Sequence, residues 1–340
     1  MAQSGIGASG VGFDEESVWG TQETTLALKW LDSRGGMESI SQTIDQIVGE
    51  DLGQFGALQE SLGKGFTSVA GSLDFDLRFG GGWLIFLSHL LGKAPVTSGS
   101  NPYTHTQALG ADPVTSQMAK GITLVVGKDG ISGGNYDWVY SGIRPTSITF
   151  DFPENGIASC SVALIGQAED AFVAAATPAY SSEPYIKSPT DATSPSAQFL
   201  SFGGTSFVCK NASISVNVPW ELRRDLQATE GLVPALAGQL EITASFEVET
   251  PSTSSTGNAF DIAYAAQTLD QAAVFTLEGG TTADRSLVIS LGQSIITTAP
   301  TPHVSGPELQ TMSVEVKAYG KADGTNEGSF VLINTDSSAW

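Results

Sequence analysis

The chain has 340 residues, of which 15 are Lys or Arg and 36 are Asp or Glu, so its formal net charge is −21. Hydrophobic residues make up 41% and charged residues only 15%, which excludes a disordered chain of low hydrophobicity and disfavours a charge-rich helical bundle. The excess of acids argues against sequence-independent binding to nucleic acid or anionic lipid, because such binding relies on Lys and Arg. We therefore expect a globular, turn-rich β protein whose length fits two domain-sized units.

The start of the chain and its cysteines narrow the expectation further. No basic segment leads into an apolar one, so we expect no signal peptide and synthesis in the cytoplasm. The most apolar run, residues 83–91, is too short to span a bilayer, and we expect no membrane partner. Cys160 and Cys209 are too few for a disulfide framework or a four-ligand zinc site, so they are given no redox or metal role.

The hydrophobic pattern of the sequence becomes regular after about residue 60. Residues 1–60 show little periodicity apart from a strand-like stretch at 24–30, and they are interpreted as an N-terminal arm with little core of its own. In residues 71–79 apolar and polar side chains alternate, which predicts a strand with one apolar and one charged face. Residues 83–91 lose this alternation and end before Gly92, which predicts a short helix.

The rest of the chain shows further strand patterns separated by turn residues. The pair Asn155-Gly156 predicts a hairpin, and residues 168–200, rich in Ala, Ser, Thr and Pro, predict an exposed connection. Strands are expected at 122–126, 148–152, 158–165, 207–218 and 239–248.

An internal repeat relates the two halves. Three segments of the first half match three of the second in the same order, with offsets of about half the chain length, so tandem units of one fold are expected. A helix at 260–269 would correspond to the one at 83–91. The matched pairs are 71–79 with 238–246, 140–150 with 304–314, and 161–165 with 329–333. The expected organisation is an arm at 1–60, a first β unit at 61–170, a connecting segment at 171–205 and a second β unit at 206–340.

The residues that could carry catalysis do not form a recognisable site. The three histidines, His89, His105 and His303, have no metal-ligand spacing and no nearby nucleophile motif, and the glycine clusters fit no phosphate-binding pattern. Asp74 and Asp76 could be a general acid and base or calcium ligands, but a solvated strand face is the favoured interpretation. The sequence therefore predicts no enzyme, no cofactor and no metal.

One ordered set of motifs resembles a known family. Residues 12–21, GFDEESVWGT, contain the pattern E-S-x-x-G-T that opens siphophage tail tube (major tail) proteins. It is followed by VAGSLDFDL at 69–77, the apolar segment ending at Gly92, YTHT at 103–106, and Gly142 before PTSIT at 145–149. The order is similar to that family over about residues 10–170, and more weakly to the end of the chain.

The resemblance implies a fold and a function. The expected fold is mainly β, with tandem tail-tube-like sandwich or barrel units that each carry a short helix and contribute strands to a ring-shaped β-barrel shared between subunits. The implied function is that of a structural virion protein, located in the tail and assembled in the host cytoplasm, whose stacked rings form a conduit for genome ejection.

The same resemblance implies partners and a ring size. The chain would associate with itself and with tape measure, tail terminator and distal tail proteins, while double-stranded DNA passes without specific binding. If the two halves are homologous, three chains supply six similar units, which favours a trimeric pseudo-hexamer over a ring of six chains. The arm at 1–60 and residues 95–118 are expected to become ordered only against a neighbouring subunit.

Alternation along the matched strands predicts a set of carboxylates on one face. If Phe75 and Phe246 face the core, the acids between the apolar positions point the other way, which in a tube can be the lumen. Carboxylates there would repel DNA and favour sliding, although the charge could also serve only solubility. The candidate lumen-facing acidic residues are Asp74, Asp76, Asp151, Glu241, Glu247 and Glu315.

Two other functions remain open from sequence. A β-sandwich adhesion or carbohydrate-binding module has a similar composition, but such a module should cluster aromatic residues on loops, and the six Trp are scattered here. The inner tube of a contractile injection machine is the other alternative, which a neighbouring sheath-protein gene would favour.

Overall fold

The computed structural model shows a mainly β protein with two helices in the part of the chain that it describes. The described residues are 8–22, 27–31, 33–48, 62–110, 112–128, 136–170, 173–174, 180–188, 199–225, 230–249, 264–265, 271–279, 285–299, 302–303, 311–319 and 328–340.

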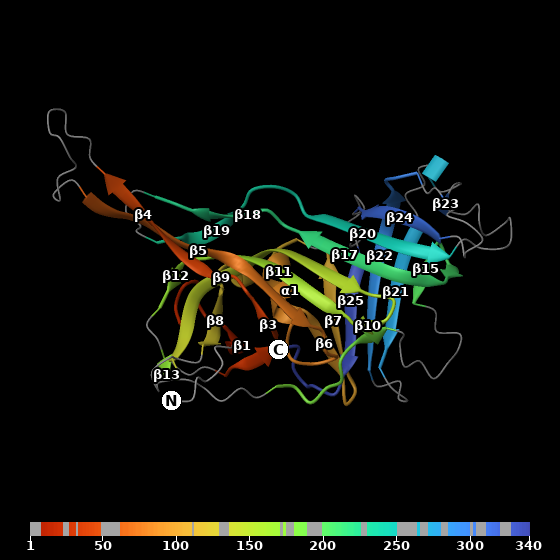
Figure 1. Ribbon diagram of the computed structural model, residues 1–340, viewed down its shortest axis with the longest axis horizontal. Helices are drawn as coiled ribbons and strands as arrows, with labels where there is room; N and C mark the ends of the chain where they lie inside the picture. Colours follow the sequence, from red (N-terminus) through yellow and green to blue (C-terminus); the bar gives the residue numbers. More distant parts are fainter. Residues whose placement is uncertain are drawn as a thin grey trace.

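Helix α1, Leu84–Leu91, lies in the middle of the molecule between sheet layers, and all eight of its residues are buried (Figure 1). A helix that is apolar on every side is stable only inside a core. Phe86 packs against Phe13 and Phe75, with ring centroids 5.3 and 5.9 Å away. Gly92 ends the helix at φ 65°, a left-handed conformation that glycine adopts without steric cost. The short helix predicted before Gly92 is confirmed.

Six strands from both halves of the chain form one continuous antiparallel sheet, in the order β5, β11, β9, β17, β20, β24. Apolar and polar residues alternate along them, so one face is buried and the other is in contact with solvent. The pairing of β9 with β17 joins the first half to the second. The bounds are β5 Leu62–Asp76, β11 Ser159–Gly166, β9 Tyr136–Phe152, β17 Cys209–Asn217, β20 Glu241–Glu249 and β24 Thr311–Ala318.

Strand β9 belongs to two sheets. Its second part pairs with β11 and β17, whereas its first part pairs with β8, which in turn pairs with β1. Gly142 lies between the two parts at φ 62°. The smaller sheet consists of β1 Ala8–Glu15, β2 Lys29–Leu31, β8 Ile122–Lys128, β12 Ala168–Glu169 and β13 Val173–Ala174 beside β9.

A second layer continues from β24 through β22, Ser286–Ile296. Its order is β16, β15, β21, β22, β25, β7, β6, so β25 from the end of the chain lies between β22 and β7, which comes from the first half. The bounds are β16 Thr205–Phe207, β15 Leu200–Phe202, β21 Gln271–Glu278, β25 Gly328–Asn334, β7 Tyr103–Leu109 and β6 Val96–Gly99.

Shorter elements complete the fold. β3 and β4 pair with β5, and the β4–β5 hairpin projects from the body of the molecule (Figure 1). Hairpin β18–β19 lies near it. The bounds are β3 Ser33–Glu38, β4 Ser41–Val48, β18 Trp220–Arg223, β19 Leu232–Leu236, β10 Gly156–Ile157, β14 Lys187–Ser188, β23 Pro302–His303 and α2 Thr115–Met118.

The expected strands are present, but their ends and neighbours differ from the sequence interpretation. β5 begins nine residues before 71 because it also pairs with β4, and β9 begins twelve residues before 148 because it pairs with β8. Of the strand expected at 24–30, residues 24–26 lie outside the described residues, residues 27–28 are not in a strand, and β2 begins at Lys29. The hairpin predicted at Asn155-Gly156 does join two antiparallel strands, β9 and β11, although β10 lies within the connection.

Three segments expected to lack contacts within the chain have them. Within residues 1–60, β1 is an inner strand between β2 and β8, and its Val11 and Phe13 are almost inaccessible. The residues that alternate with Val11 and Phe13 are the glycines Gly10 and Gly12 rather than polar residues, so the apolar–polar pattern of a strand is not visible in the sequence. In residues 95–118, β7 pairs with β25 of the same chain, so the expectation of order only against a neighbour is wrong for β7. In the connection at 168–200, Ile186 is fully buried rather than exposed.

The matched segments of the internal repeat do not share one pairing order. β5 and β9 lie on either side of β11, whereas their counterparts β20 and β24 pair directly with each other. The helix predicted at 260–269 lies outside the described residues apart from Tyr264 and Ala265. The division of the chain into an arm, a first β unit, a connecting segment and a second β unit stays a prediction.

Candidate functional site

One face of the six-strand sheet collects all six predicted carboxylates. The strands are in register, so residues of the same orientation form rows across the sheet. From β5 to β24, one row is Asp76, Ser159, Asp151, Ser213, Ser245 and Glu315, and the next is Asp74, Ser161, Thr149, Ser215, Thr243 and Lys317. Glu241 and Glu247 lie opposite Asn217 and Asn211 on the same face.

The orientation predicted by alternation is confirmed. Phe75 and Phe246 are 1% and 2% exposed, whereas Asp151, Glu241 and Glu315 are exposed. The apolar side of the six strands includes Leu73, Phe75, Ile148, Phe150, Val162, Ile214, Ile242, Phe246 and Val314. Whether the polar side lines a lumen stays a prediction.

The sequence interpretation missed part of this surface. Glu249 follows the same alternation at the end of β20. We call the surface the acidic face; its acids are Asp74, Asp76, Asp151, Glu241, Glu247, Glu249 and Glu315. The apolar–polar alternation that identified the other six acids also places Glu249 on this face, so the sequence could have identified it.

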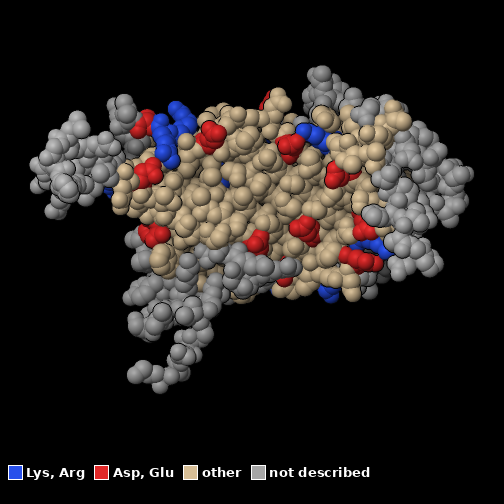
Figure 2. All heavy atoms as spheres, turned by 45° about the horizontal axis from the view of Figure 1, so that its top comes forward, with Lys and Arg blue, Asp and Glu red and all other residues tan. Residues whose placement is uncertain are grey.

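The positions between the acids carry small hydroxyl and amide side chains. Ser213, Ser215, Thr243 and Ser245 line a shallow hollow with Glu315. Lys317 shares a row with Asp74, and its ammonium group contacts Glu241, whose hydrogen bond raises the pKa of Lys317. Figure 2, which brings the top of Figure 1 forward, shows acids dispersed over mostly uncharged residues, with Lys and Arg toward the margins. Such a surface offers few cations to a phosphate backbone.

The E-S-x-x-G-T motif ties the smaller sheet to the bend in β9. The carboxylate of Glu16, which is fully buried, accepts the N–H of Gly142 at 2.7 Å, the N–H of Gly20 at 2.8 Å and the hydroxyl of Thr123 at 3.0 Å. Burial raises the pKa of Glu16 to about 7, with a further increase from the charge of Asp170, although all three donors favour the ionised form. Glu16 thus connects β1, β8 and the bend at Gly142.

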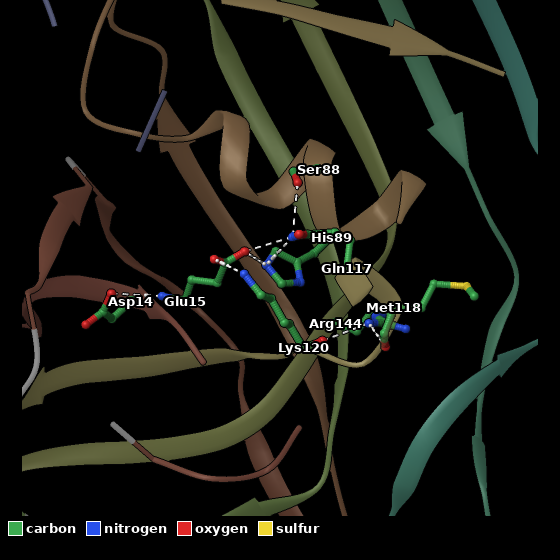
Figure 3. A network of polar contacts seen from close by, with 8 residues as sticks. All are labelled: Asp14, Glu15, Ser88, His89, Gln117, Met118, Lys120 and Arg144. Atoms are coloured by element: carbon green, nitrogen blue, oxygen red, sulfur yellow. Dashed lines mark hydrogen bonds and ion pairs between the residues drawn. The ribbon is translucent and has the colours of Figure 1, made fainter. Parts of the chain in front are cut away.

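Glu15, on the other side of the same strand end, organises a second polar network beside α1 (Figure 3). Its carboxylate lies 2.8 Å from both Gln117 Nε2 and Lys120 Nζ, and 3.2 Å from His89 Nε2. Burial alone would raise the pKa of Glu15, but hydrogen bonds involving His89, Lys120 and Gln117 outweigh it and lower the pKa to about 2. Burial lowers the pKa of His89, which is a structural residue in this network.

Arg144 completes the junction between the two halves. It is fully buried, and its Nη2 donates to the carbonyls of Met118 and Lys120 at 2.7 and 2.8 Å (Figure 3). Its guanidinium lies over the rings of Trp19 and Trp220, 5.3 and 4.8 Å from their centroids, which is cation–π geometry. Burial lowers the pKa of Arg144 to about 10, so it stays charged at neutral pH.

Of the other two histidines considered in the sequence, His105 is held in place by packing, whereas the side chain of His303 lies outside the described part of the chain. His105 contacts Thr97, Asn334 and the carbonyl of Asp336, which is a structural arrangement. Among the described residues, no three His, Cys, Asp or Glu side chains are grouped as metal ligands. No helix in the described ranges is both long and apolar enough to cross a membrane.

The fold defines a class: a β protein in which one broad antiparallel sheet, built from both halves of the chain, presents an acidic and hydroxyl-rich face. The model of one family, described as phage tail tube protein, matches residues 8–318. The chain belongs to the phage tail tube protein family, and it is a component of the virion tail. A comparison with curated proteins finds none that matches the chain.

Proposed function

We propose that this tail tube protein is non-catalytic and assembles as stacked rings into the hollow tube of a siphophage tail, through which the genome is ejected. The observation that carries the proposal is the acidic face, because its carboxylates come from both halves of the chain and yet lie on one sheet surface. A tube wall needs one such continuous surface turned toward the conduit.

The chemistry of the acidic face suits the passage of double-stranded DNA without specific binding. DNA carries about one negative charge per 1.7 Å of its axis, and each Lys or Arg contact adds affinity through counterion release. The acidic face instead offers carboxylates and small hydroxyls, and Lys317 is engaged by Glu241. Repulsion of the phosphates would keep the DNA from adhering to the wall.

Strand number supports a trimeric ring. If the six strands of the acidic face line the bore, three copies supply about eighteen, a number at which β-barrels enclose an open aqueous channel. Closing the sheet into a ring would also remove exposed strand edges. Six copies would supply about twice as many strands. We therefore favour three chains with pseudo-sixfold symmetry.

The expected partners rest on the family resemblance. They are further copies of the chain, a tape measure protein, a tail terminator and a distal tail protein, with assembly in the host cytoplasm. The inner tube of a contractile machine would use the same ring, so a sheath-protein gene next to this one would favour that alternative over a siphophage tail.

Electron microscopy of the purified protein tests the proposal. We expect hollow tubes or rings, and image symmetry with three chains per ring. A true sixfold axis with one chain per unit would contradict the trimer but not the tube. A protein that stays monomeric at every concentration and binds glycans would contradict the tube and favour the adhesion alternative.

A further inference from the structure

Buried oxygen atoms without a hydrogen-bond partner gather beside the bend in β9. They are Ser141 Oγ on β9, Gln167 Oε1 in the turn between β11 and β12, and Asp170 Oδ2 directly after β12. All three atoms are inaccessible to solvent, and the whole of Ser141 is 1% exposed. Because native proteins rarely leave buried polar atoms unpaired, a hydrogen-bond donor or a cation is expected at such a place.

Main-chain hydrogen bonds hold these residues together. The N–H of Gln167 donates to the carbonyl of Ser141 at 3.2 Å, and the N–H of Asp170 donates to the carbonyl of Val139 at 2.8 Å. Burial raises the pKa of Asp170, and the hydroxyl of Ser141 approaches this carboxylate closely enough to offset part of the increase, although the two groups lack hydrogen-bond geometry. Ser141 is therefore directed at the carboxylate of Asp170.

A second carboxylate reaches the same cluster from the other half of the chain. Glu230 Oε2 accepts from Gln167 Nε2 at 3.2 Å, and the charge of Glu230 raises the pKa of Asp170 beyond the effect of burial. The backbone of Glu230 is held in place by a β-bridge with Thr67 on β5. The four side chains Ser141, Gln167, Asp170 and Glu230 thus form one cluster whose members are positioned before anything binds.

The cluster carries negative charge that no cationic side chain balances. In the part of the chain that the structure describes, neither Asp170 nor Glu230 forms an ion pair with a Lys or Arg. The carboxylate of Glu16 is also near, since the charge of Asp170 contributes to its raised pKa. Like charges at a partly buried place repel each other, and a bound cation would remove this repulsion. The unpaired atoms are all oxygens, which hard divalent cations prefer as ligands.

From this arrangement we propose that Asp170 and Glu230 bind a calcium ion, with the amide oxygen of Gln167 and the hydroxyl of Ser141 as neutral ligands. Water would fill the remaining positions, and Ca²⁺ accepts such a mixed and irregular set of oxygens more readily than Mg²⁺, which demands octahedral geometry. Only two acids bind the ion, in keeping with the finding that no three acidic, His or Cys ligands are grouped in the described ranges. The ion would fasten Glu230 of the second half to the bend of β9, and the proposal does not depend on the tube.

Isothermal titration calorimetry with Ca²⁺ tests the site on the chain freed of metal by a chelator, at physiological ionic strength so that diffuse binding to surface acids is screened. We expect one ion per chain, and a loss of affinity of about tenfold or more in Asp170→Asn and in Glu230→Gln. Glu154→Gln is the matched control, since Glu154 is exposed on a loop outside the cluster, and it should bind as the unmodified chain does. Equal affinities in all four proteins, or equal losses in all three variants, would overturn the site.

Terbium luminescence gives a second measurement that reports where the ion lies. Tb³⁺ occupies Ca²⁺ sites and emits when a nearby tryptophan is excited, and the indole N–H of Trp19 donates to the carbonyl of Gly231, next to Glu230, at 3.2 Å. We expect emission that added Ca²⁺ displaces, that Glu230→Gln abolishes and that Glu154→Gln keeps. Because Glu230 is exposed, its substitution should leave the fold intact, which circular dichroism checks. Full emission from folded Glu230→Gln, or an unmodified chain that binds neither ion at millimolar concentrations, would overturn the proposal.

Discussion

At the scale of single residues, the buried polar groups of this protein hold its sheets together. Glu16 joins three segments through one carboxylate, and Arg144 joins the two halves through two tryptophans. Buried charges of this kind are costly to desolvate, and removing one partner leaves the other unsatisfied. Where such a buried group titrates, as Glu16 does, the free energy of unfolding should depend on pH.

We predict that Glu16 makes folding less favourable as pH rises from about 4.5 to beyond 7. Its pKa is about 7 in the folded chain against an ordinary value of 4.5, so the folded state holds the proton more tightly over that interval. The shift corresponds to about 3 kcal/mol of unfolding free energy. Thermal unfolding between pH 5 and pH 8 measures it. The raised pKa of Asp170 contributes with the same sign.

The variant Glu16→Gln isolates this contribution. It should be less stable at every pH, because its amide N–H₂ cannot accept from Gly20, yet its stability should decline less between pH 5 and pH 8 than that of the unmodified chain, where the contribution of Asp170 remains. Asp112→Asn, at an exposed loop position, should keep the decline. Parallel pH profiles for the unmodified chain and Glu16→Gln would show that Glu16 does not titrate in this range.

At the scale of elements, β9 decides the architecture. It bends at Gly142, so its first part completes the smaller sheet and its second part lies in the middle of the acidic face. The bend is fixed by the carboxylate of Glu16 and by Gln167 and Trp19, which pack around Gly142.

We predict that Gly142→Ala strongly destabilises the fold. A Cβ would lie 2.7 Å from Gln167 Cβ, and φ 62° is unfavourable for alanine. The left-handed conformation costs about 1–2 kcal/mol, and overpacking adds about 1–3 kcal/mol. Gly204→Ala is the matched control, since Gly204 has φ 78° but no atom within 4 Å of the place its Cβ would take. Denaturant unfolding should separate the two; equal losses of stability would exclude crowding at the bend.

At the scale of the whole molecule, the acidic face and the net charge of −21 suit a wall that DNA slides along. Glu241 is partly neutralised by Lys317, so Asp74 and Asp151 are the better positions for charge reversal. They lie on the strands that flank β11, in adjacent rows of the acidic face.

We predict that the double variant Asp74→Lys/Asp151→Lys assembles normally but slows genome ejection. Asp151 is exposed and Asp74 is half-buried on the polar side of the sheet, so their substitution should cost little stability, and new phosphate contacts would hold the DNA. Added salt should restore the rate, because screening at physiological ionic strength acts over about 8 Å. The control Asp112→Lys/Glu154→Lys changes the net charge equally at exposed positions outside the acidic face. Equal ejection rates for both double variants at low salt would contradict a lumenal role.

The sequence by itself determined the features that depend on neighbours along the chain: the short apolar helix before Gly92, the family motif, and the orientation of Asp74, Asp151 and Glu315 opposite an apolar face. These follow from the two-residue period of a strand and from local turn chemistry. Only the tertiary structure decided that β9 pairs with β17, that Glu16 binds the bend 126 residues away, and that Glu241 pairs with Lys317. Strand partners are chosen by packing between distant segments, and alternation alone does not specify which strands meet.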